Sequence, residues 1–89
     1  MDMRRLVGRN VARLRQQKRL TQEQLADLSG FSQQYISGLE RGERNPTVVT
    51  LYELARALGV NHVDLVKPDD GREISKPRRG RPNRRQDVS

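Results

Sequence analysis

The chain has 89 residues, of which 33% are hydrophobic and 33% are charged, and its formal net charge is +7. This length allows one small domain with a compact core. The absence of cysteine excludes a disulfide scaffold and a thiolate metal site. No apolar run approaches the ~20 residues that a membrane span needs, and no apolar signal region opens the sequence. We therefore expect a soluble, intracellular protein.

Positive charge is concentrated at the two ends of the sequence. The formal charge is +6 over residues 1–20, −3 over residues 21–66 and +4 over residues 67–89. Basic flanks around a near-neutral centre are typical of proteins that bind a polyanion. A basic surface that serves only solubility has the same composition, so charge alone leaves both interpretations open.

Apolar residues at helical spacing predict a series of short helices. Over residues 3–19, for example, Val7, Val11 and Leu14 stand at i, i+4 and i+7, which is one face of a helix. The predicted inward-facing residues, in chain order, are Leu6, Val7, Val11 and Leu14; Leu25, Ala26 and Leu28; Ile36 and Leu39; Leu51, Leu54, Ala55 and Leu58; and Val63, Leu65 and Val66. Because no segment indicates a strand, the predicted fold is an all-α, compact bundle of about five short helices.

Cap residues and glycines predict where these helices begin and end. Thr21 and Gln24 have the spacing of a capping box at the start of the second helix. The later helices are predicted to begin after caps at Ser32, Thr47 and Asn61. The second, third and fourth helices are predicted to stop at Gly30, Gly42 and Gly59. Pro68 ends the regular structure, which gives a domain over residues 1–67 and a tail over residues 68–89 that we expect to be disordered.

The second and third helices are joined by a very short turn that contains Gly30 and Phe31, and both have polar outer faces. Such a pair is typical of a helix-turn-helix, in which one helix enters the DNA major groove and its neighbour braces it. From Leu6 to Val66 the sequence resembles the phage-repressor and Cro class, also called the xenobiotic-response-element family. The resemblance is carried by Val11-Ala12-Arg13-Leu14-Arg15, Leu20-Thr21-Gln22-Glu23-Gln24-Leu25-Ala26, Tyr35-Ile36-Ser37-Gly38-Leu39-Glu40-Arg41-Gly42, Asn45-Pro46-Thr47 and Leu54-Ala55-Arg56-Ala57-Leu58-Gly59-Val60.

This resemblance implies a sequence-specific, DNA-binding transcriptional regulator, with repression as the default, whose third helix contacts base edges. Gln33 and Gln34 begin that helix, and a glutamine amide suits the acceptor and donor of adenine. Ser37 and Gly38 are expected to face outward one turn further on. Gly38 either permits a close backbone approach to the DNA or weakens base contact there. Ser37 can hydrogen-bond either a base edge or a phosphate. The alternative for Gln33 and Gln34 is that they are ordinary solvated residues at a helix start.

A second set of residues is expected to contact phosphates. Gln22 opens the second helix, where a side-chain amide and free backbone N–H groups can meet an anion; its alternative role is a plain helix start. Tyr35 is equally consistent with core packing and with a hydroxyl contact to phosphate. The remaining phosphate candidates are Ser32, the predicted cap of the third helix, and the loop residues Arg41, Arg44 and Asn45, for which a solvated loop is the alternative.

Arg15 and Glu40 are expected to form a structural ion pair, because the family pattern pairs an arginine at the end of the first helix with a glutamate at the end of the third. Removing one partner of such a pair would be strongly destabilising. His62 has no partner in the sequence pattern and is expected to lie at the surface.

The tail contains a short basic element that resembles an AT-hook, a minor-groove binder of AT-rich DNA. An extended glycine-centred segment fits a narrow minor groove, and flanking arginines meet its negative potential. The tail residues concerned are Arg78, Arg79, Gly80, Arg81, Pro82, Arg84 and Arg85. Nonspecific phosphate binding, a protein partner and solubility are the alternative roles.

The sequence offers no nucleophile–base pair, phosphate loop or metal-ligand cluster, so we expect no enzyme, cofactor or metal. The expected partner is double-stranded DNA, bound by a homodimer that contacts through the last helix, Asn61 to Val66. The rival hypothesis is a protein-interaction module, such as an antitoxin or antiactivator that binds a toxin or a transcription activator. The expected location is the cytoplasm, at the bacterial nucleoid.

Overall fold

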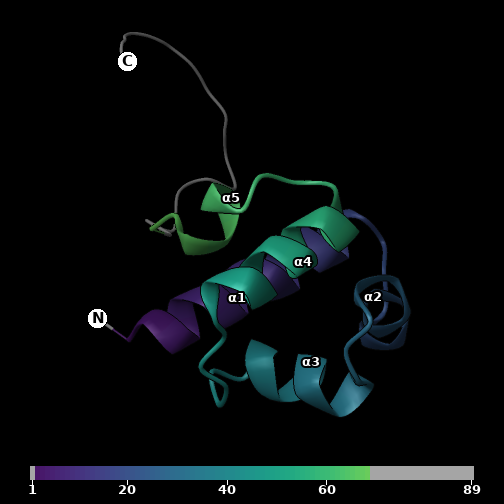
Figure 1. The fold of residues 1–89 in the computed structure, drawn as a ribbon, viewed down its shortest axis with the longest axis horizontal. Helices are drawn as coiled ribbons and strands as arrows, with labels where there is room; N and C mark the ends of the chain where they lie inside the picture. Colours follow the sequence, from purple (N-terminus) through teal and green to yellow (C-terminus); the bar gives the residue numbers. More distant parts are fainter. Residues whose placement is uncertain (1, 69–89) are drawn as a thin grey trace, which may run out of the picture.

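The computed structural model describes residues 2–68 and contains five helices and no strand within them (Figure 1). The helices are α1 (Met3–Gln17), α2 (Gln22–Ser29), α3 (Gln33–Glu40), α4 (Val48–Leu58) and α5 (Val63–Val66). The all-α prediction is confirmed. In the described part of the chain, no helix combines the length and apolarity that crossing a membrane requires.

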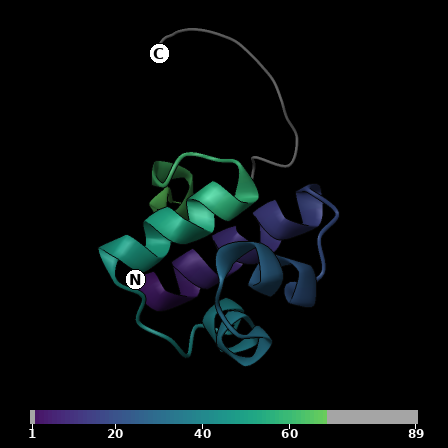
Figure 2. The same ribbon diagram turned by 45° about the vertical axis from the view of Figure 1, so that its right-hand side comes forward.

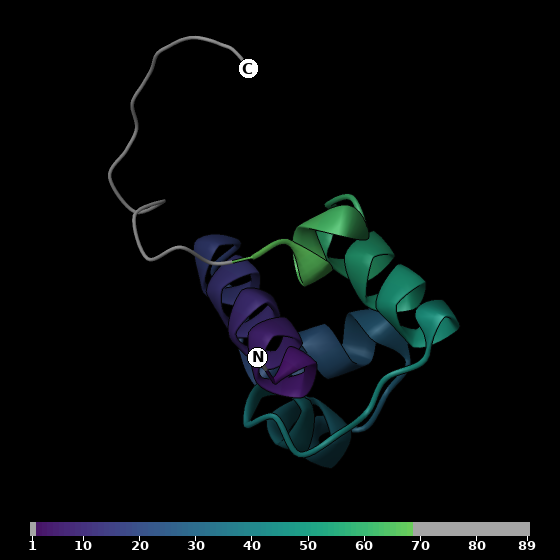
Figure 3. The same ribbon diagram turned by 90° about the vertical axis from the view of Figure 1, so that its left-hand side faces the viewer.

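α1 is the element around which the others pack. It contacts α3, α4 and α5, while α2 contacts α3 and α4. Figures 2 and 3 show that α3 and α5 lie on opposite sides of the domain, with α1 and α4 between them. The helix-turn-helix pair therefore lies at one end of the domain, and the end of the described chain lies at the other.

The helix ends follow the predicted caps. The Thr21 hydroxyl accepts from the Gln24 backbone N–H, and the Gln24 side chain accepts from the Thr21 N–H, at 3.0 and 2.8 Å. Ser32 and Thr47 cap α3 and α4 in the same way, each through a 3.0 Å bond. Gly30 and Gly59 take left-handed conformations, with φ of 85° and 72°, and stop α2 and α4.

Two helix ends differ from the sequence prediction. α1 ends at Gln17 rather than at Arg19, because Arg19 adopts a positive φ of 59° that turns the chain toward α2. The last helix begins after His62, which makes no side-chain cap hydrogen bond, rather than directly after the predicted cap Asn61. The Asn61 side chain nevertheless accepts from the Val63 backbone N–H at 2.9 Å. Helical conformation is confined to the four residues from Val63 to Val66.

Over residues 2–68, the core contains twelve buried apolar residues drawn from all five helices. They are Leu6, Val7, Val11, Leu14, Leu25, Ala26, Ile36, Leu39, Leu54, Ala55, Leu58 and Leu65. The prediction of an inward-facing Leu28 was wrong, since this side chain is 60% exposed. α2 buries only Leu25 and Ala26, and Leu28 lies at its edge, beside the charged side chains Glu53 and Arg56 of α4. Val63 is also half-exposed rather than inward-facing.

Asn10 is a buried polar residue that the periodicity analysis missed. Its side chain is 1% exposed, and its amide donates to the carbonyl oxygens of Leu65 and Lys67 at 2.9 and 3.0 Å. Asn10 therefore binds the end of α5 to the middle of α1. The predictions for the tail, including its AT-hook-like segment, concern residues that lie outside the described part of the chain.

Candidate nucleic-acid interface

α3 presents one polar face to the outside. Its apolar residues Ile36 and Leu39 are fully buried, and the helix packs against α1 and α2. On the opposite side, Gln33 and Gln34 are exposed, directly after the exposed cap Ser32. Within residues 2–68, no hydrogen bond engages either side-chain amide. Both amides are therefore available to an external partner.

The outer face of α3 differs from the prediction at Gly38. Gly38 is buried rather than outward-facing, because the Arg44 side chain covers it. A Cβ atom at this position would lie 2.9 Å from Arg44 Nε. The neighbouring Ser37 is half-buried, and its hydroxyl accepts a hydrogen bond from Arg41 Nη1 at 2.5 Å. The Ser37 hydroxyl proton remains available for an external acceptor.

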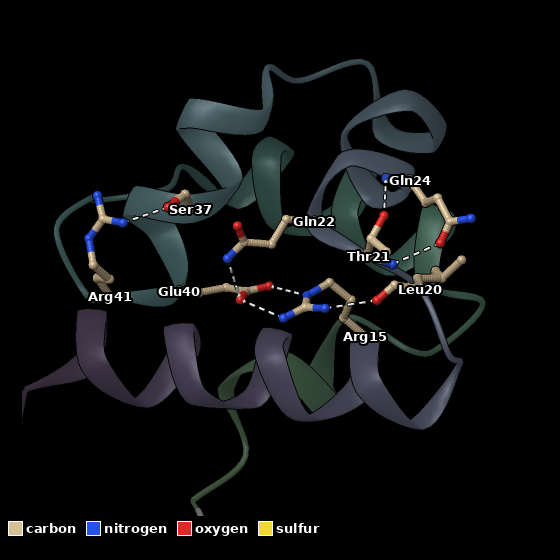
Figure 4. A network of polar contacts seen from close by, with 8 residues as sticks. All are labelled: Arg15, Leu20, Thr21, Gln22, Gln24, Ser37, Glu40 and Arg41. Atoms are coloured by element: carbon tan, nitrogen blue, oxygen red, sulfur yellow. Dashed lines mark hydrogen bonds and ion pairs between the residues drawn. The ribbon is translucent and has the colours of Figure 1, made fainter.

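Arg15 and Glu40 form the ion pair that the family resemblance implied (Figure 4). Arg15 Nε and Nη2 donate to the two Glu40 carboxylate oxygens at 2.6 and 3.0 Å, which is a bidentate geometry. Arg15 Nη1 also donates to the Leu20 carbonyl oxygen at 2.8 Å. Only 12% of the Arg15 side chain and 7% of the Glu40 side chain are exposed. The pair therefore ties the end of α1 to the end of α3.

Gln22 joins this network rather than standing free at the start of α2. Its amide nitrogen donates to Glu40 Oε1 at 3.0 Å (Figure 4), and the residue is half-buried. An amide nitrogen carries two protons, so one donor remains for a phosphate. The structure thus holds the Gln22 side chain in one orientation, through the same carboxylate that anchors α3.

The loop after α3 carries the charged candidates. Arg41 and Glu43 form an exposed ion pair at 3.1 Å. The hydrogen bonds from Arg41, followed by its positive charge, lower the pKa of the Glu43 carboxyl below its ordinary value. Arg44 and Asn45 are exposed in the same loop.

Tyr35 is half-buried, and its ring packs as the core interpretation predicted, while a contact of its hydroxyl to phosphate stays a prediction. Its ring packs against Phe31, with the ring centroids 5.2 Å apart, and it also contacts the core. The Arg44 guanidinium lies over the same ring, 5.7 Å from its centroid. Core packing thus fixes the ring, and the ring in turn holds a cation at the side of α3.

Arg5 is a candidate phosphate contact that the analysis of motifs missed. A Cβ atom on Gly42 would lie 2.9 Å from Arg5 Cγ, so the first turn of α1 lies against the loop that follows α3. The Arg5 side chain is 74% exposed and lies 3.8 Å from the Asp2 carboxylate. The only sequence signal was the general basic character of residues 1–20. Together, Arg5, Arg41 and Arg44 form a basic edge beside the polar face of α3.

An apolar groove lies between α4 and α5. Its volume is about 480 Å³, and its lining residues are Val48, Val49, Leu51, Tyr52, His62 and Val66. Val48 and Val49 are 80% and 68% exposed, which is unusual for valine side chains that lie side by side. His62 is exposed, as expected, but it lines this groove.

Comparisons with known proteins agree with this geometry. A helix-turn-helix family model matches residues 11–65. The uncharacterized HTH-type transcriptional regulator y4dJ of Sinorhizobium fredii is 71% identical over 70 residues, which cover 79% of this chain and 91% of that protein. Control protein C.SmaI of Serratia marcescens is 44% identical over 61 residues, covering 68% of this chain and 73% of that protein.

Among solved structures, the restriction-modification controller protein C.AhdI from Aeromonas hydrophila is similar, with a TM-score of 0.68 and 40% identity. The match covers 70% of this chain and 94% of that one. A family match over most of the described helices and these identities point to the same conclusion. The chain belongs to the helix-turn-helix family and is a regulator of transcription.

Proposed function

We propose that the protein binds double-stranded DNA sequence-specifically, with α3 in the major groove. The observation that carries this proposal is the exposed pair Gln33 and Gln34 at the start of α3, whose amides have no partner within residues 2–68. A glutamine amide can donate to N7 and accept from N6 of adenine in the same plane. α2 braces α3 from behind, as the groove geometry requires.

Phosphate contacts surround these base contacts. The second amide proton of Gln22, the hydroxyl groups of Ser32 and Ser37, and the loop residue Asn45 supply polar donors along the flanks of α3. Arg5 and Arg41 supply positive charge at its far end. Each cation that neutralises a phosphate releases counterions, so affinity is expected to fall steeply with salt.

A titration of the DNA upstream of the protein's own gene, with random DNA as competitor, tests the major-groove proposal. Replacing Gln33 and Gln34 with alanine is expected to abolish the preference for that DNA and to leave the circular dichroism spectrum unchanged. The matched control replaces Gln16 and Gln17, which are exposed glutamines on α1, and should keep the preference. An unchanged preference in the Gln33/Gln34 variant would refute the proposal.

We propose further that the protein acts as a homodimer whose copies meet at the groove between α4 and α5. A single α3 contacts only a few base pairs, so two copies on half-sites about one helical turn apart are needed for useful specificity. The groove is apolar, and Val48, Val49 and Tyr52 are all at least half-exposed beside it. A second copy would bury this surface and add the last helix, Asn61 to Val66, to the contact.

Sedimentation tests the dimer. Val49→Glu places a charge in the groove and is expected to give a monomer that has lost cooperative DNA binding. Leu28→Glu is the matched control, since Leu28 is similarly exposed on another face, and it should leave association unchanged. If Val49→Glu sediments like the unaltered protein, the second copy does not occupy this groove. Retention of a toxin or a transcription activator there would favour the protein-interaction alternative.

Repression is the proposed direction of regulation, because a protein that occupies a promoter excludes polymerase from it. A reporter fused to the promoter of the protein's own gene is expected to lose activity when the protein is supplied. The proposed place of action is the nucleoid in the bacterial cytoplasm. Control of restriction and modification genes is a second candidate, favoured by the similarity to C.SmaI and C.AhdI. The presence of such genes beside this one would support it.

The basic tail is proposed to add a second DNA contact to the domain of residues 1–67. Its composition suits the minor groove of AT-rich DNA and also nonspecific phosphate binding. Deleting residues 68–89 is expected to weaken binding and to reduce its salt dependence. If affinity and salt dependence are both unchanged after deletion, neither DNA role is correct.

A further inference from the structure

The Arg44 side chain lies across one flank of α3 instead of extending from its loop into solvent. Its Nε, Cγ and Cδ atoms are 2.9, 3.5 and 3.7 Å from the place that a Cβ atom on Gly38 would occupy. Its Cζ atom is 5.7 Å from the centroid of the Tyr35 ring. Two features of α3 therefore define where Arg44 lies, namely the missing side chain of Gly38 and the aromatic face of Tyr35.

This flank adjoins the face that is proposed to contact bases. Gly38 follows Gln34 by four residues and Tyr35 by three, so all three lie on one side of the helix, one turn apart. The Arg44 side chain covers Gly38, which is one helical turn from Gln34. It occupies the space that the side chain of a larger residue at position 38 would fill.

Arg44 and Arg41 differ in what already holds them. Arg41 is paired with Glu43 and also donates to Ser37. Within residues 2–68, no carboxylate lies within ion-pair distance of the Arg44 guanidinium, which is held by an uncharged ring. The carboxylate of Glu43 interacts electrostatically with Arg44 but forms no ion pair with it, so the planar set of N–H donors is available to an external acceptor.

We propose that Arg44 contacts the base edge of a guanine in the major groove, and that Gly38 and Tyr35 position it to do so. A guanidinium donates to O6 and N7 of guanine from one rigid, planar set of N–H groups, whereas the ammonium of lysine is a compact charge on a flexible stem. Because Gly38 has no side chain, the Arg44 side chain can lie against α3, and the ring of Tyr35 limits the orientations of the guanidinium. The inference rests on the proposed function, because it requires α3 to enter the major groove.

Selection from a randomised double-stranded DNA library tests the contact. The unaltered protein is expected to enrich a site with a G·C pair at a fixed place in each half-site. Arg44→Lys keeps the charge but loses the planar arrangement of donors that Tyr35 orients, and should reduce the preference for that pair by roughly 5- to 150-fold. Arg56→Lys is the control, because Arg56 is an exposed arginine on α4 that has no proposed DNA contact, and it should retain the preference.

Gly38→Ala tests the positioning. Alanine favours the helix over glycine, and its Cβ atom would meet only the flexible Arg44 side chain, so the variant is expected to fold and to melt at an equal or higher temperature. Displacement of Arg44 should nevertheless remove the same base preference. Loss of preference in Arg44→Lys alone would overturn the role of Gly38 and keep the contact.

The failure of this inference is distinguishable from the failure of the proposed function. If the unaltered protein enriches a site, and Arg44→Lys enriches the same site with the same base preferences, the Arg44 contact is wrong and groove binding stands. If the unaltered protein enriches no sequence at all, the proposed function is wrong, and the Arg44 contact falls with it.

Discussion

Replacing Glu40 with alanine is the perturbation for which the structure gives the clearest magnitude. The carboxylate of Glu40 accepts two hydrogen bonds from Arg15 and one from Gln22, and 7% of its side chain is exposed. The variant would leave the Arg15 guanidinium without a counter-charge at a position where 12% of its side chain is exposed. Removing one partner of a buried pair in this way typically costs about 3–5 kcal/mol.

The lower end of that range is expected here. Arg15 keeps its hydrogen bond to the Leu20 carbonyl oxygen, and its residual exposure allows water to reach the space that the glutamate leaves. A loss of about 3 kcal/mol in the free energy of unfolding would lower the melting temperature of a domain of this size by roughly 12–24 °C. Such a loss is a large fraction of the total stability of a small domain.

Urea and thermal unfolding, followed by far-ultraviolet circular dichroism, measure the effect. Glu43→Ala is the control, because it removes a carboxylate from an ion pair whose side chains are 58% and 60% exposed, and it should lower the midpoint far less than Glu40→Ala does. The double variant Arg15→Met/Glu40→Leu removes both charges, and it should recover most of the lost stability. If Glu40→Ala and Glu43→Ala unfold at the same midpoint, the buried pair does not stabilise the fold as argued.

Three further predictions concern other contacts. Gly8→Ala should destabilise the domain by about 1–3 kcal/mol in urea unfolding, because the added Cβ atom would lie 2.5 Å from the Leu39 carbonyl oxygen. Thr21→Ala should cost about 0.5–2 kcal/mol by the same measurement, while Thr21→Ser should keep the cap. The Glu43 carboxyl should titrate below its ordinary pKa of 4.5 in a nuclear magnetic resonance experiment, and Arg41→Gln should return its pKa toward that value. The small stabilisation by this pair is fully present above pH 4.5, and it is lost as the pH falls through the lowered pKa of Glu43.

The helix ends were predictable because their determinants are local. The capping box of Thr21 and Gln24 lies within four residues, and Gly30 stops α2 through its own backbone conformation. Such interactions are encoded in adjacent sequence and form in the same way in any tertiary context. The core of the longer helices α1 and α4 was likewise predicted from periodicity, because each has enough turns to define one apolar face.

The errors arose where the outcome depends on a neighbour distant in sequence. α2 has only two turns, so its inward face could not be assigned from periodicity, and Leu28 was misplaced. Gly38 was expected to be exposed, but it is covered by a residue from the following loop. Asn10 and Arg5 became visible only through their contacts with Leu65 and with Gly42. No pattern in a single sequence reports such pairings.

The contacts that stabilise the domain also determine how α3 is presented to DNA. Gly8 allows α1 to approach the carbonyl oxygens at the C-terminal end of α3, and the pair of Arg15 and Glu40 joins the same two helices. Both contacts fix the C-terminal half of α3 against α1. They therefore also fix the direction in which its N-terminal half, with Gln33 and Gln34, points. A change at Gly8 or Glu40 should therefore weaken DNA binding without any loss of direct contact. Affinities of such variants must accordingly be compared after correction for the fraction of folded protein, and a decrease that survives this correction measures the positioning of α3 itself.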